Sequence, residues 1–466
     1  MSANKNSSQE LLSYLKFNGP TLSSELVSRF GISRPTLSRR VHELGNAVVS
    51  IGHARATMIA ARLQEFSGTT PLYMIKKSGQ VERIGQLTPV RDGERVQWLL
   101  KSDKALPVFF EGEFKNGLYP GWPWFLEDLR PSGFLGRSFG KRMAELLQVD
   151  ENPEKWGDLE LLNILTSHGS NLHGNLLVGD GRALEEHQRD RIQNADARYP
   201  NTSPEVYQEL ADLALREGGE FGSSAGGEQP KFTTVMRDNP QDDPRAVIVK
   251  FSPQLESPAG LRWADLLYAE QIANEVLRGA GFETAQTRTF HRGERVFLES
   301  TRFDRVGISG RRGVVTLRAI DAAHLGQGSG SWADVAPKLY TGKWITAEDR
   351  DRMIQLHCFG ELIANTDMHW GNLSFFLPEE SPYPLAPVYD MLPMRFRPSS
   401  TGEVVERDFE PRLPKPENQK AWLEMYPHAI QFWQKVSADS NITSDFKSIA
   451  KEALGTLKKI HKTASA

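Results

Sequence analysis

Apolar residues recur at helical spacing over residues 7–17, and the Gly-Pro pair at 19–20 ends this predicted helix. A second short helix ends at Gly31, and a third begins at Ser33 with Pro35 in its first turn. Proline is tolerated there because a first-turn N–H has no partner within the helix. Two short helices joined by a glycine turn predict a helix-turn-helix.

The third predicted helix has an apolar stripe of Leu37, Val41 and Leu44, and a strand pair over residues 47–63 would follow it as the wing of a winged helix. Its polar side would enter the major groove of DNA and contact base edges and phosphates. A solvated basic face, or a winged helix that docks on protein, gives the same pattern. The residues of the polar side are Arg34, Thr36, Ser38, Arg39 and Arg40.

Residues 67–200 carry periodic patterns but no recognisable chemistry, and they predict a small α+β subdomain. Strand-like stretches cover 71–87, 95–101 and 105–114, and helix-like stretches cover 139–147 and 158–169. Beyond residue 200, strand-like stretches surround one long helix over residues 261–281, and the last part of the chain is mainly helical.

Composition fits a chain of several domains without a membrane span. Of the 466 residues 39% are apolar and 25% are charged, and no run of eighteen apolar residues occurs. Cys358 is the only cysteine, which excludes intrachain disulfides and cysteine-rich zinc sites. The N-terminus lacks the pattern of a signal peptide, so we expect a cytoplasmic protein. Residues 1–66 hold eight Lys/Arg against four Glu, which favours a nucleic-acid partner there.

A glycine-rich loop precedes a strand-like stretch at residues 218–231 and has the composition of a phosphate-binding loop. Glycines let backbone N–H groups approach phosphate oxygens closely. The Walker motif is absent, so a strand–loop–strand cover over the phosphates is the better match, although a plain surface loop has similar composition. The candidate nucleotide contacts in it are Ser224, Ala225, Gly226, Gly227, Glu228, Gln229 and Lys231.

The strand-like residues 246–251 place Lys250 in an apolar run, as in the kinase strand whose lysine holds the nucleotide phosphates. The long helix that follows carries Glu270, which could form the matching ion pair. Thr301 and Phe303 then lie where an adenine-binding hinge is expected. In the plainer interpretation, Arg302, Asp304 and Arg305 form a structural ion-pair network at that point.

Asp367 and Asn372 stand five positions apart on a predicted loop, and Asp390 ends a strand-like stretch further on. In kinases an Asp accepts the proton of the substrate hydroxyl, while an Asn and a second Asp hold Mg²⁺ against the phosphates of ATP. His369 lies between the first two and is a candidate catalytic residue. Each residue alone would be read as a cap or a turn former, so the prediction rests on their order.

Taken together, the stretches NTDMHWGN, SSAGGEQPK, RFDR and YDMLP resemble the HipA family of serine/threonine kinases, which are toxins of bacterial toxin–antitoxin systems. The resemblance implies Asp367 and His369 as catalytic residues, and Asn372 and Asp390 as ligands of Mg²⁺. It further implies that Lys250, Glu270, Thr301, Phe303 and His369 contact ATP, and that Ser224 is an autophosphorylation site. The fused helix-turn-helix resembles the YjjJ-like branch of the family.

The partners implied by the resemblance are a protein substrate, for which the family precedent is an aminoacyl-tRNA synthetase, and a HipB-like antitoxin. A helix-turn-helix that binds palindromic DNA also favours a homodimer. Two other functions fit the residues. One is a DNA-binding transcriptional regulator with a vestigial kinase fold, and the other is a metal-dependent nuclease toxin that uses Asp367, His369 and Asn372.

The predicted fold class is therefore α+β: a two-lobed protein-kinase-like catalytic fold of HipA type behind a winged helix-turn-helix domain. The expected parts are 1–66, the DNA-binding domain; 67–200, the α+β subdomain; 201–305, the ATP-binding lobe with its glycine-rich loop; and 306–466, the mainly helical catalytic lobe.

Overall fold

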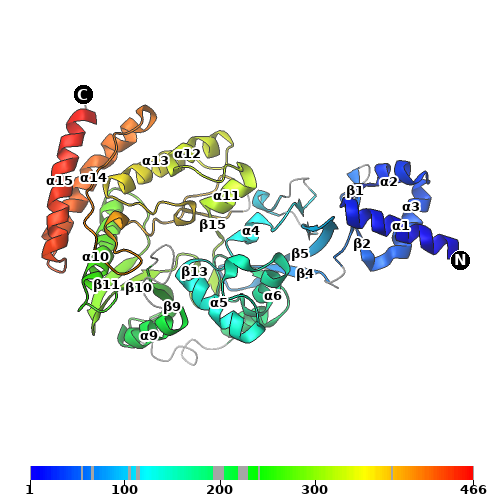
Figure 1. Ribbon diagram of the computed structural model, residues 1–466, viewed down its shortest axis with the longest axis horizontal. Coiled ribbons are helices and arrows are strands. Elements are labelled where there is room, and N and C mark those ends of the chain that lie inside the picture. The colour runs from blue at the N-terminus through cyan, green and yellow to red at the C-terminus, as the bar shows by residue number, and fades with distance from the viewer. Residues whose placement is uncertain are drawn as a thin grey trace.

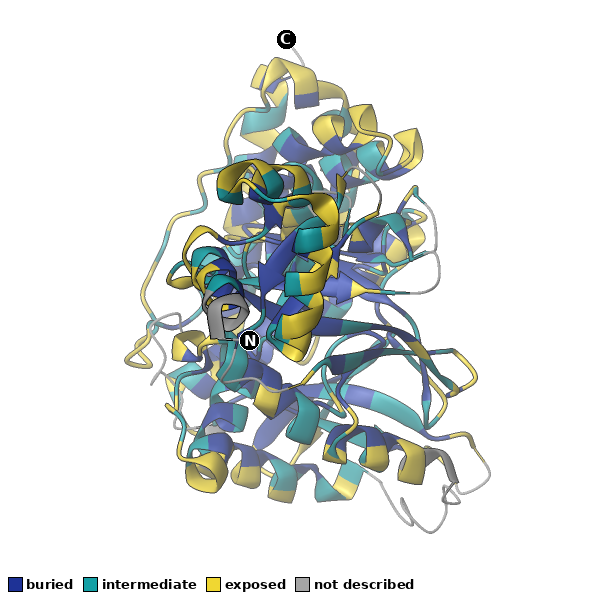
Figure 2. Cartoon of the chain, turned by 90° about the vertical axis from the view of Figure 1, so that its right-hand side faces the viewer, coloured by how far each residue is buried: buried dark blue, intermediate teal, exposed yellow. Residues whose placement is uncertain are grey.

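Helices and strands follow one another in groups from one end of the molecule to the other. Figure 1 shows the N-terminal helices at one end and helices α14 and α15 at the opposite end. Buried residues follow the strands and the inner faces of the helices (Figure 2). The computed structural model describes residues 2–53, 56–63, 68–102, 106–111, 116–192, 204–218, 229–239, 242–378 and 381–464.

The N-terminal elements have the order of a winged helix. Gly31 joins α2 to α3 in a left-handed conformation (φ 60°), and the Ser33 hydroxyl caps α3 by accepting the N–H of Thr36 at 3.3 Å. Leu37 is buried, whereas Arg34 and Arg39 are exposed. Strand β3 lies between β1 and β2. The elements are α1 (Ser2–Asn18), β1 (Thr21–Leu22), α2 (Ser23–Phe30), α3 (Arg34–Leu44), β2 (Val48–Ile51) and β3 (Met58–Ala61).

An antiparallel sheet in the order β7-β6-β5-β4-β8 forms the next group, together with helices α4 to α7. The predicted strand over residues 105–114 is wrong over residues 106–111, the part of it that the structure describes: Val108–Phe110 forms a 3₁₀ turn after Pro107, and Phe109 and Phe110 are both buried. Adjacent side chains on a strand point to opposite faces, so this pair suits a turn better. The elements are β4 (Thr70–Ile75), β5 (Val81–Asp92), β6 (Arg95–Lys101), β7 (Leu118–Tyr119), β8 (Leu176–Val178), α4 (Trp124–Glu127), α5 (Gly133–Leu147), α6 (Asp158–His168) and α7 (Arg182–Ile192).

The wing of the N-terminal unit packs directly on this sheet. Val49 and Ala60 of the wing share one buried apolar cluster with Val90 and Leu99 of β5 and β6. The backbone N–H of Leu63 also donates to Pro89 O at 3.1 Å. Burial of a shared apolar face fixes the orientation of the N-terminal unit on the sheet.

A second antiparallel sheet, in the order β11-β12-β10-β9, carries the long helix α10. The expected strand before the glycine-rich loop is wrong, because helix α9 runs up to Gly218 and packs on β9. Leu210, Ala211 and Ala214 supply its apolar side at helical spacing. The elements are α9 (Tyr207–Gly218), β9 (Lys231–Met236), β10 (Arg245–Phe251), α10 (Pro258–Gly279), β11 (Thr287–Arg292) and β12 (Arg295–Thr301).

The C-terminal part is mainly helical, with α13 packed between α12 and α14, and α14 packed on α15. Short strand pairs β13–β14 and β15–β16 lie at its start. Within the described ranges no helix is both long and apolar enough to cross a membrane. The elements are β13 (Arg305–Val306), β14 (Gly310–Arg311), β15 (Val314–Thr316), α11 (Leu317–His324), α12 (Trp332–Thr341), α13 (Ala347–Leu362), β16 (Ser374–Phe376), α14 (Gln419–Ala438) and α15 (Ser444–Ala464).

Candidate active site

Lys250 lies near the end of β10 and bridges two carboxylates. Its Nζ is 2.7 and 2.6 Å from the two oxygens of Glu270 on α10, and 2.5 Å from Oδ1 of Asp390. Lys250 and Glu270 are 6% and 2% exposed, so this ion pair is almost closed to water. The structure therefore brings together three residues predicted from separate motifs, which lie up to 140 positions apart (250 to 390) in the chain.

The charges of this triad depend on one another. Burial alone would lower the pKa of Lys250, but the carboxylates of Asp390 and Glu270 outweigh burial and raise it. Burial opposes the ionisation of Asp390 too, but Lys250 and Lys231 lower the pKa of Asp390 to about 2. Burial raises the pKa of Glu270, and the charge of Lys250 works against that rise. The lysine is thus held as a cation and Asp390 as an anion at neutral pH.

The loop after α13 forms a closed turn around Asp367. The Nδ2 of Asn372 donates to Asp367 O at 2.8 Å, and the Asn365 Oδ1 accepts the N–H of Asp367 at 3.0 Å. The Nδ1 of His369 accepts the N–H of Gly371 at 3.0 Å. The bonds from Asn372 and to Asn365 use only backbone atoms of Asp367, which is half-buried. The carboxylate of Asp367 takes no part in them.

Asp390 lies beside this turn. The hydroxyl of Tyr389 donates to Gly371 O at 2.7 Å, and the Nδ2 of Asn365 donates to Asp390 O at 3.4 Å. The prediction of a strand ending in Asp390 is wrong in its local form: Val388 makes a single parallel bridge to Thr284, and the backbone then turns at Asp390 with φ 54°. A left-handed aspartate is uncommon, and here it directs the carboxylate to Lys250.

The expected phosphate loop is described only at its end. Ser224, Ala225, Gly226, Gly227 and Glu228 lie outside the described residues. Lys231 pairs in register with Lys250 across β9 and β10, and its charge reaches both Asp390 and Glu270. Gln229 is 7% exposed, and its buried Nε2 has no hydrogen-bond partner among the residues that the structure describes. Pro230, the next residue, accepts the N–H of Phe251 at 3.2 Å, so the described end of the loop adjoins the end of β10.

The predicted hinge residues lie between the sheet and the catalytic turn. Thr301 pairs with Val247 across β10 and β12, and the N–H of Arg302 donates to Ala246 O at 2.9 Å. The Phe303 ring centre is 5.8 Å from that of Tyr389, directly before Asp390. Phe303 thus packs within the protein on the residue that precedes the triad aspartate.

Arg302, Asp304 and Arg305 form the structural network that the plainer interpretation expected. The Asp304 carboxylate accepts from Arg302 at 2.9 Å and from Arg305 at 2.6 Å. It also accepts the N–H of Gly174 at 3.0 Å, which ties the hinge to the neighbouring α+β group. Burial opposes its charge, but the two guanidinium groups hold the pKa of Asp304 well below its usual range.

The residues predicted to hold magnesium have suitable donor atoms. Mg²⁺ prefers oxygen ligands from carboxylates and amides, with waters completing an octahedron. Asn372 uses its Nδ2 in the turn, which leaves Oδ1 available, and Asp390 is bonded to Lys250 through one oxygen. The two residues come from backbone segments that Tyr389 joins by its bond to Gly371. The donor set therefore fits the cation.

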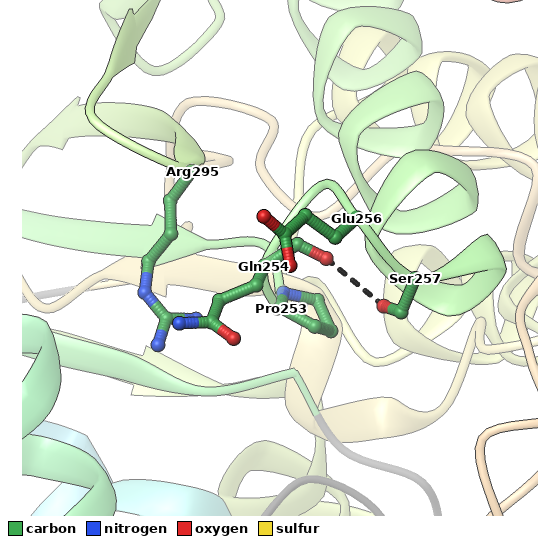
Figure 3. A pocket seen from close by; sticks show the side chains of 5 residues that line it. All are labelled: Pro253, Gln254, Glu256, Ser257 and Arg295. Carbon is green, nitrogen blue, oxygen red and sulfur yellow. Dashed lines mark hydrogen bonds between the residues drawn. The ribbon is translucent and has the colours of Figure 1, made fainter.

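A cavity of about 450 Å³ lies elsewhere, at the connection from β10 to α10 (Figure 3). It is lined by Pro253, Gln254, Glu256, Ser257 and Arg295, none of which was predicted as a site residue. Ser257 caps α10 through the N–H of Gly260 at 3.0 Å, and the guanidinium of Arg295 donates to Ser252 O at 3.0 Å. These contacts give Ser257 and Arg295 structural roles. The candidate site therefore remains the Lys250–Glu270–Asp390 triad together with the Asp367–Asn372 turn.

Sequence reasoning missed two residues that assemble the site, Asn365 and Tyr389. Asn365 contacts both the Asp367 backbone and the Asp390 carbonyl, and Tyr389 bonds to Gly371 and Ser374. Each lies within two positions of a predicted site aspartate, Asp367 or Asp390, and that position was the available signal. Their partners are distant in sequence, so spacing alone could not show what they bind.

Comparisons with known proteins agree with this architecture. Residues 66–187 match the family model of the YjjJ-like toxin middle domain, and residues 223–462 match the HipA-like C-terminal domain. The toxin YjjJ of Escherichia coli K12 is 35% identical over 445 residues, which cover 95% of this chain and 96% of that protein.

Solved structures are more distant. HipA in a complex with HipB and operator DNA, from Shewanella oneidensis MR-1, aligns with a TM-score of 0.53 at 15% identity, over 85% of this chain and 100% of its own. The Helicobacter pylori proinflammatory kinase CtkA aligns over 51% of this chain and 91% of its own, with a TM-score of 0.37 at 13% identity, which is too low to establish a shared fold.

The HipA match shows the fold, and the YjjJ match extends over almost the whole length of both proteins. The chain therefore belongs to the HipA-like toxin family, in its YjjJ-like branch.

Proposed function

We propose that the protein is a Mg-ATP-dependent kinase that transfers the γ-phosphate to a serine or threonine hydroxyl of a protein. The observation that carries the proposal is Lys250, held between Glu270 at 2.6 Å and Asp390 at 2.5 Å beside the Asp367–Asn372 turn. Kinases require both a lysine–glutamate ion pair and a metal-binding aspartate to be in place at once. Family membership supports the toxin role.

In the proposed reaction the acceptor hydroxyl oxygen forms a bond to the γ-phosphorus, and the bond from that phosphorus to the bridging oxygen breaks to release ADP. Asp367 accepts the hydroxyl proton, since its carboxylate is not used by the turn. Lys250 binds phosphate oxygens as a cation, and Glu270 fixes its position. Bound Mg²⁺, held by Asn372 and Asp390, would neutralise phosphate charge.

The proposed role of His369 is to support the turn and to contact the nucleotide. Because its Nδ1 accepts the Gly371 N–H, the neutral ring carries its proton on Nε2. That N–H faces away from the turn as a further donor for phosphate. Thr301 and Phe303 are proposed to flank the adenine, and autophosphorylation at Ser224 remains a proposal from the family resemblance.

Nucleotide binding tests the proposal without knowledge of the acceptor. Titration calorimetry of the full chain with ATP should show binding that requires Mg²⁺ and that Lys250→Met and Asp390→Asn each weaken by at least about tenfold. Asp351, exposed on α13, provides a matched Asp351→Asn control. Equal binding by all variants would refute the proposed site. Cleavage of DNA that survives Lys250→Met would instead favour a nuclease.

A second proposed activity is DNA binding by the N-terminal unit. Its α3 presents Arg34, Ser38 and Arg39 to solvent, while Leu37 is buried in the cluster formed with α1. Arg40 and Thr36 are half-buried at the edges of the same face. The HipA of S. oneidensis was solved with HipB and operator DNA. We propose that this chain contacts DNA through its own α3, and that a HipB-like antitoxin and a homodimer are further partners to test.

A further inference from the structure

An arginine that no motif singled out lies against the catalytic turn. A Cβ on Gly371 would stand 3.8 Å from a guanidinium nitrogen of Arg318 and 3.0 Å from His369 Nδ1. The Arg318 side chain therefore lies over the backbone of the turn that Asn372 closes on Asp367.

The fold holds the backbone of Arg318 firmly in this place. Thr316 caps α11 by accepting the N–H of Ala319 at 3.3 Å, and Asp128 accepts both the N–H and the hydroxyl of Thr316 at 2.7 Å. The N–H of Leu317 donates to Leu373 O at 2.8 Å, one residue after Asn372. The second residue of α11 is thus anchored from both sides, while its side chain is exposed.

The charge of Arg318 is unpaired among the residues that the structure describes. In the part of the chain that the structure describes, its guanidinium has no hydrogen bond or ion pair. By contrast, Lys250 is bound by Glu270 and Asp390, and the guanidinium of Arg312 is stacked 3.4 Å from the ring centre of Phe376. An unpaired cation beside the Asp367–Asn372 turn is suited to an anion that is present only during the reaction.

We infer that Arg318 is a catalytic residue that contacts the transferred phosphoryl group on the acceptor side of the site. The inference rests on the proposed kinase function. Lys250 binds phosphate from the sheet side and the Nε2 of His369 faces it from the turn, so Arg318 adds a further positive charge from α11. A planar guanidinium can hold two phosphoryl oxygens while the bond to the bridging oxygen breaks and the bond to the acceptor oxygen forms.

The test compares Arg318→Ala and Arg318→Lys with the wild type in the full chain. Transfer of labelled phosphate from saturating Mg-ATP to itself or to proteins of a bacterial extract gives the rate, and calorimetry gives the affinity for Mg-ATP. Arg318→Ala should lower the rate by about 100-fold and leave the affinity within about twofold, and Arg318→Lys should lose less. Arg352→Ala, on the surface of α13, should match the wild type.

A wild-type rate in Arg318→Ala overturns the inference. So does a parallel fall in Mg-ATP affinity, which would place Arg318 in ground-state nucleotide binding. Recovery of the full rate at higher extract concentration overturns it as well, because Arg318 would then bind the acceptor protein rather than the phosphoryl group. Absence of transfer in the wild type is a different result, since it contradicts the proposed kinase function itself.

Discussion

At the scale of residues, the site depends on one cation shared by two carboxylates. Lys250 faces Glu270, which is almost fully buried, and Asp390, which is 27% exposed and so can also meet solvent or ligand. In the proposed kinase, this difference in exposure would make Glu270 a structural partner of the lysine and Asp390 a ligand-binding one. Glu270 positions the lysine, and Asp390 has an oxygen left for a metal ion.

The Glu270→Gln variant tests whether Glu270 positions Lys250. The amide keeps the size of the side chain but removes the charge that fixes Lys250, so we expect phosphate transfer to fall by at least about tenfold. The expected rise in KM for ATP follows from a less constrained lysine. Steady-state kinetics of Glu270→Gln and of Glu275→Gln, an exposed glutamate on the same helix, measures the effect. Equal kinetics of the two variants would contradict the assigned role.

At the scale of elements, the order of motifs predicted the arrangement of β10, α10 and the catalytic turn. A buried strand that carries a lysine and is followed by a long apolar helix has few alternative packings. The pairing of Lys250 with Glu270 could therefore be predicted from the sequence. The strand at Val388 and the strand before the glycine loop were not predicted correctly. Asp390 takes a left-handed turn set by distant contacts. The spacing of Leu210, Ala211 and Ala214 does indicate a helix before the glycine loop, so there the strand expected from kinases was the wrong guide.

Helix α3 gives a prediction for DNA binding. Arg39→Ala and Arg40→Ala should each weaken binding to duplex DNA and reduce the slope of log affinity against log salt by about one, if each contacts a phosphate. Fluorescence anisotropy over a range of salt concentrations measures both. Arg352→Ala serves as the control because α13 lies in the helical C-terminal part. Unchanged affinity and slope in both α3 variants would exclude α3 as the DNA contact.

The hinge network gives a prediction for stability. Asp304→Asn removes the charge that compensates Arg302 and Arg305 while they remain buried, and should lower the free energy of unfolding by about 3–5 kcal/mol. Urea denaturation compared with Asp351→Asn measures the loss. A difference below about 1 kcal/mol would show that water or neighbouring carbonyls satisfy the two guanidinium groups after the change.

At the scale of the whole molecule, consecutive groups of elements share buried contacts. The wing packs on β5 and β6, Asp304 joins the hinge to the α+β group, and Phe109 of that group packs 6.0 Å from Tyr383 of the C-terminal part. The boundaries predicted at 66, 200 and 305 stay predictions. The contacts across them could not be read from the sequence, because each pairs residues far apart in the chain.

His324, whose ring stacks on Tyr383 at this aromatic contact, predicts that the stability of the protein depends on pH. Burial lowers the pKa of His324 to about 4, and its ring stacks 3.6 Å from Trp344. Between pH 6.5 and pH 4 the unfolded chain therefore binds a proton that the folded protein does not, so stability falls as pH falls. The expected loss is on the order of 2 kcal/mol, allowing for partial exposure.

Urea denaturation at pH 7 and pH 4 measures this loss. His324→Phe keeps an aromatic ring in the stack and should reduce the difference between the two pH values, whereas His42→Gln, on the exposed side of α3, should not. The same pH difference in all three proteins would mean that other groups cause the acid sensitivity.

Phosphate transfer by the full chain tests the central claim most directly. Wild-type protein, Asp367→Asn and the control Asp351→Asn would be incubated with labelled ATP, Mg²⁺ and a bacterial extract, and labelled proteins identified by mass spectrometry. We expect label on a serine or threonine with wild-type and control protein, and at least about a 100-fold lower rate with Asp367→Asn. No label with the wild type, or equal label with Asp367→Asn, would contradict a kinase whose base is Asp367.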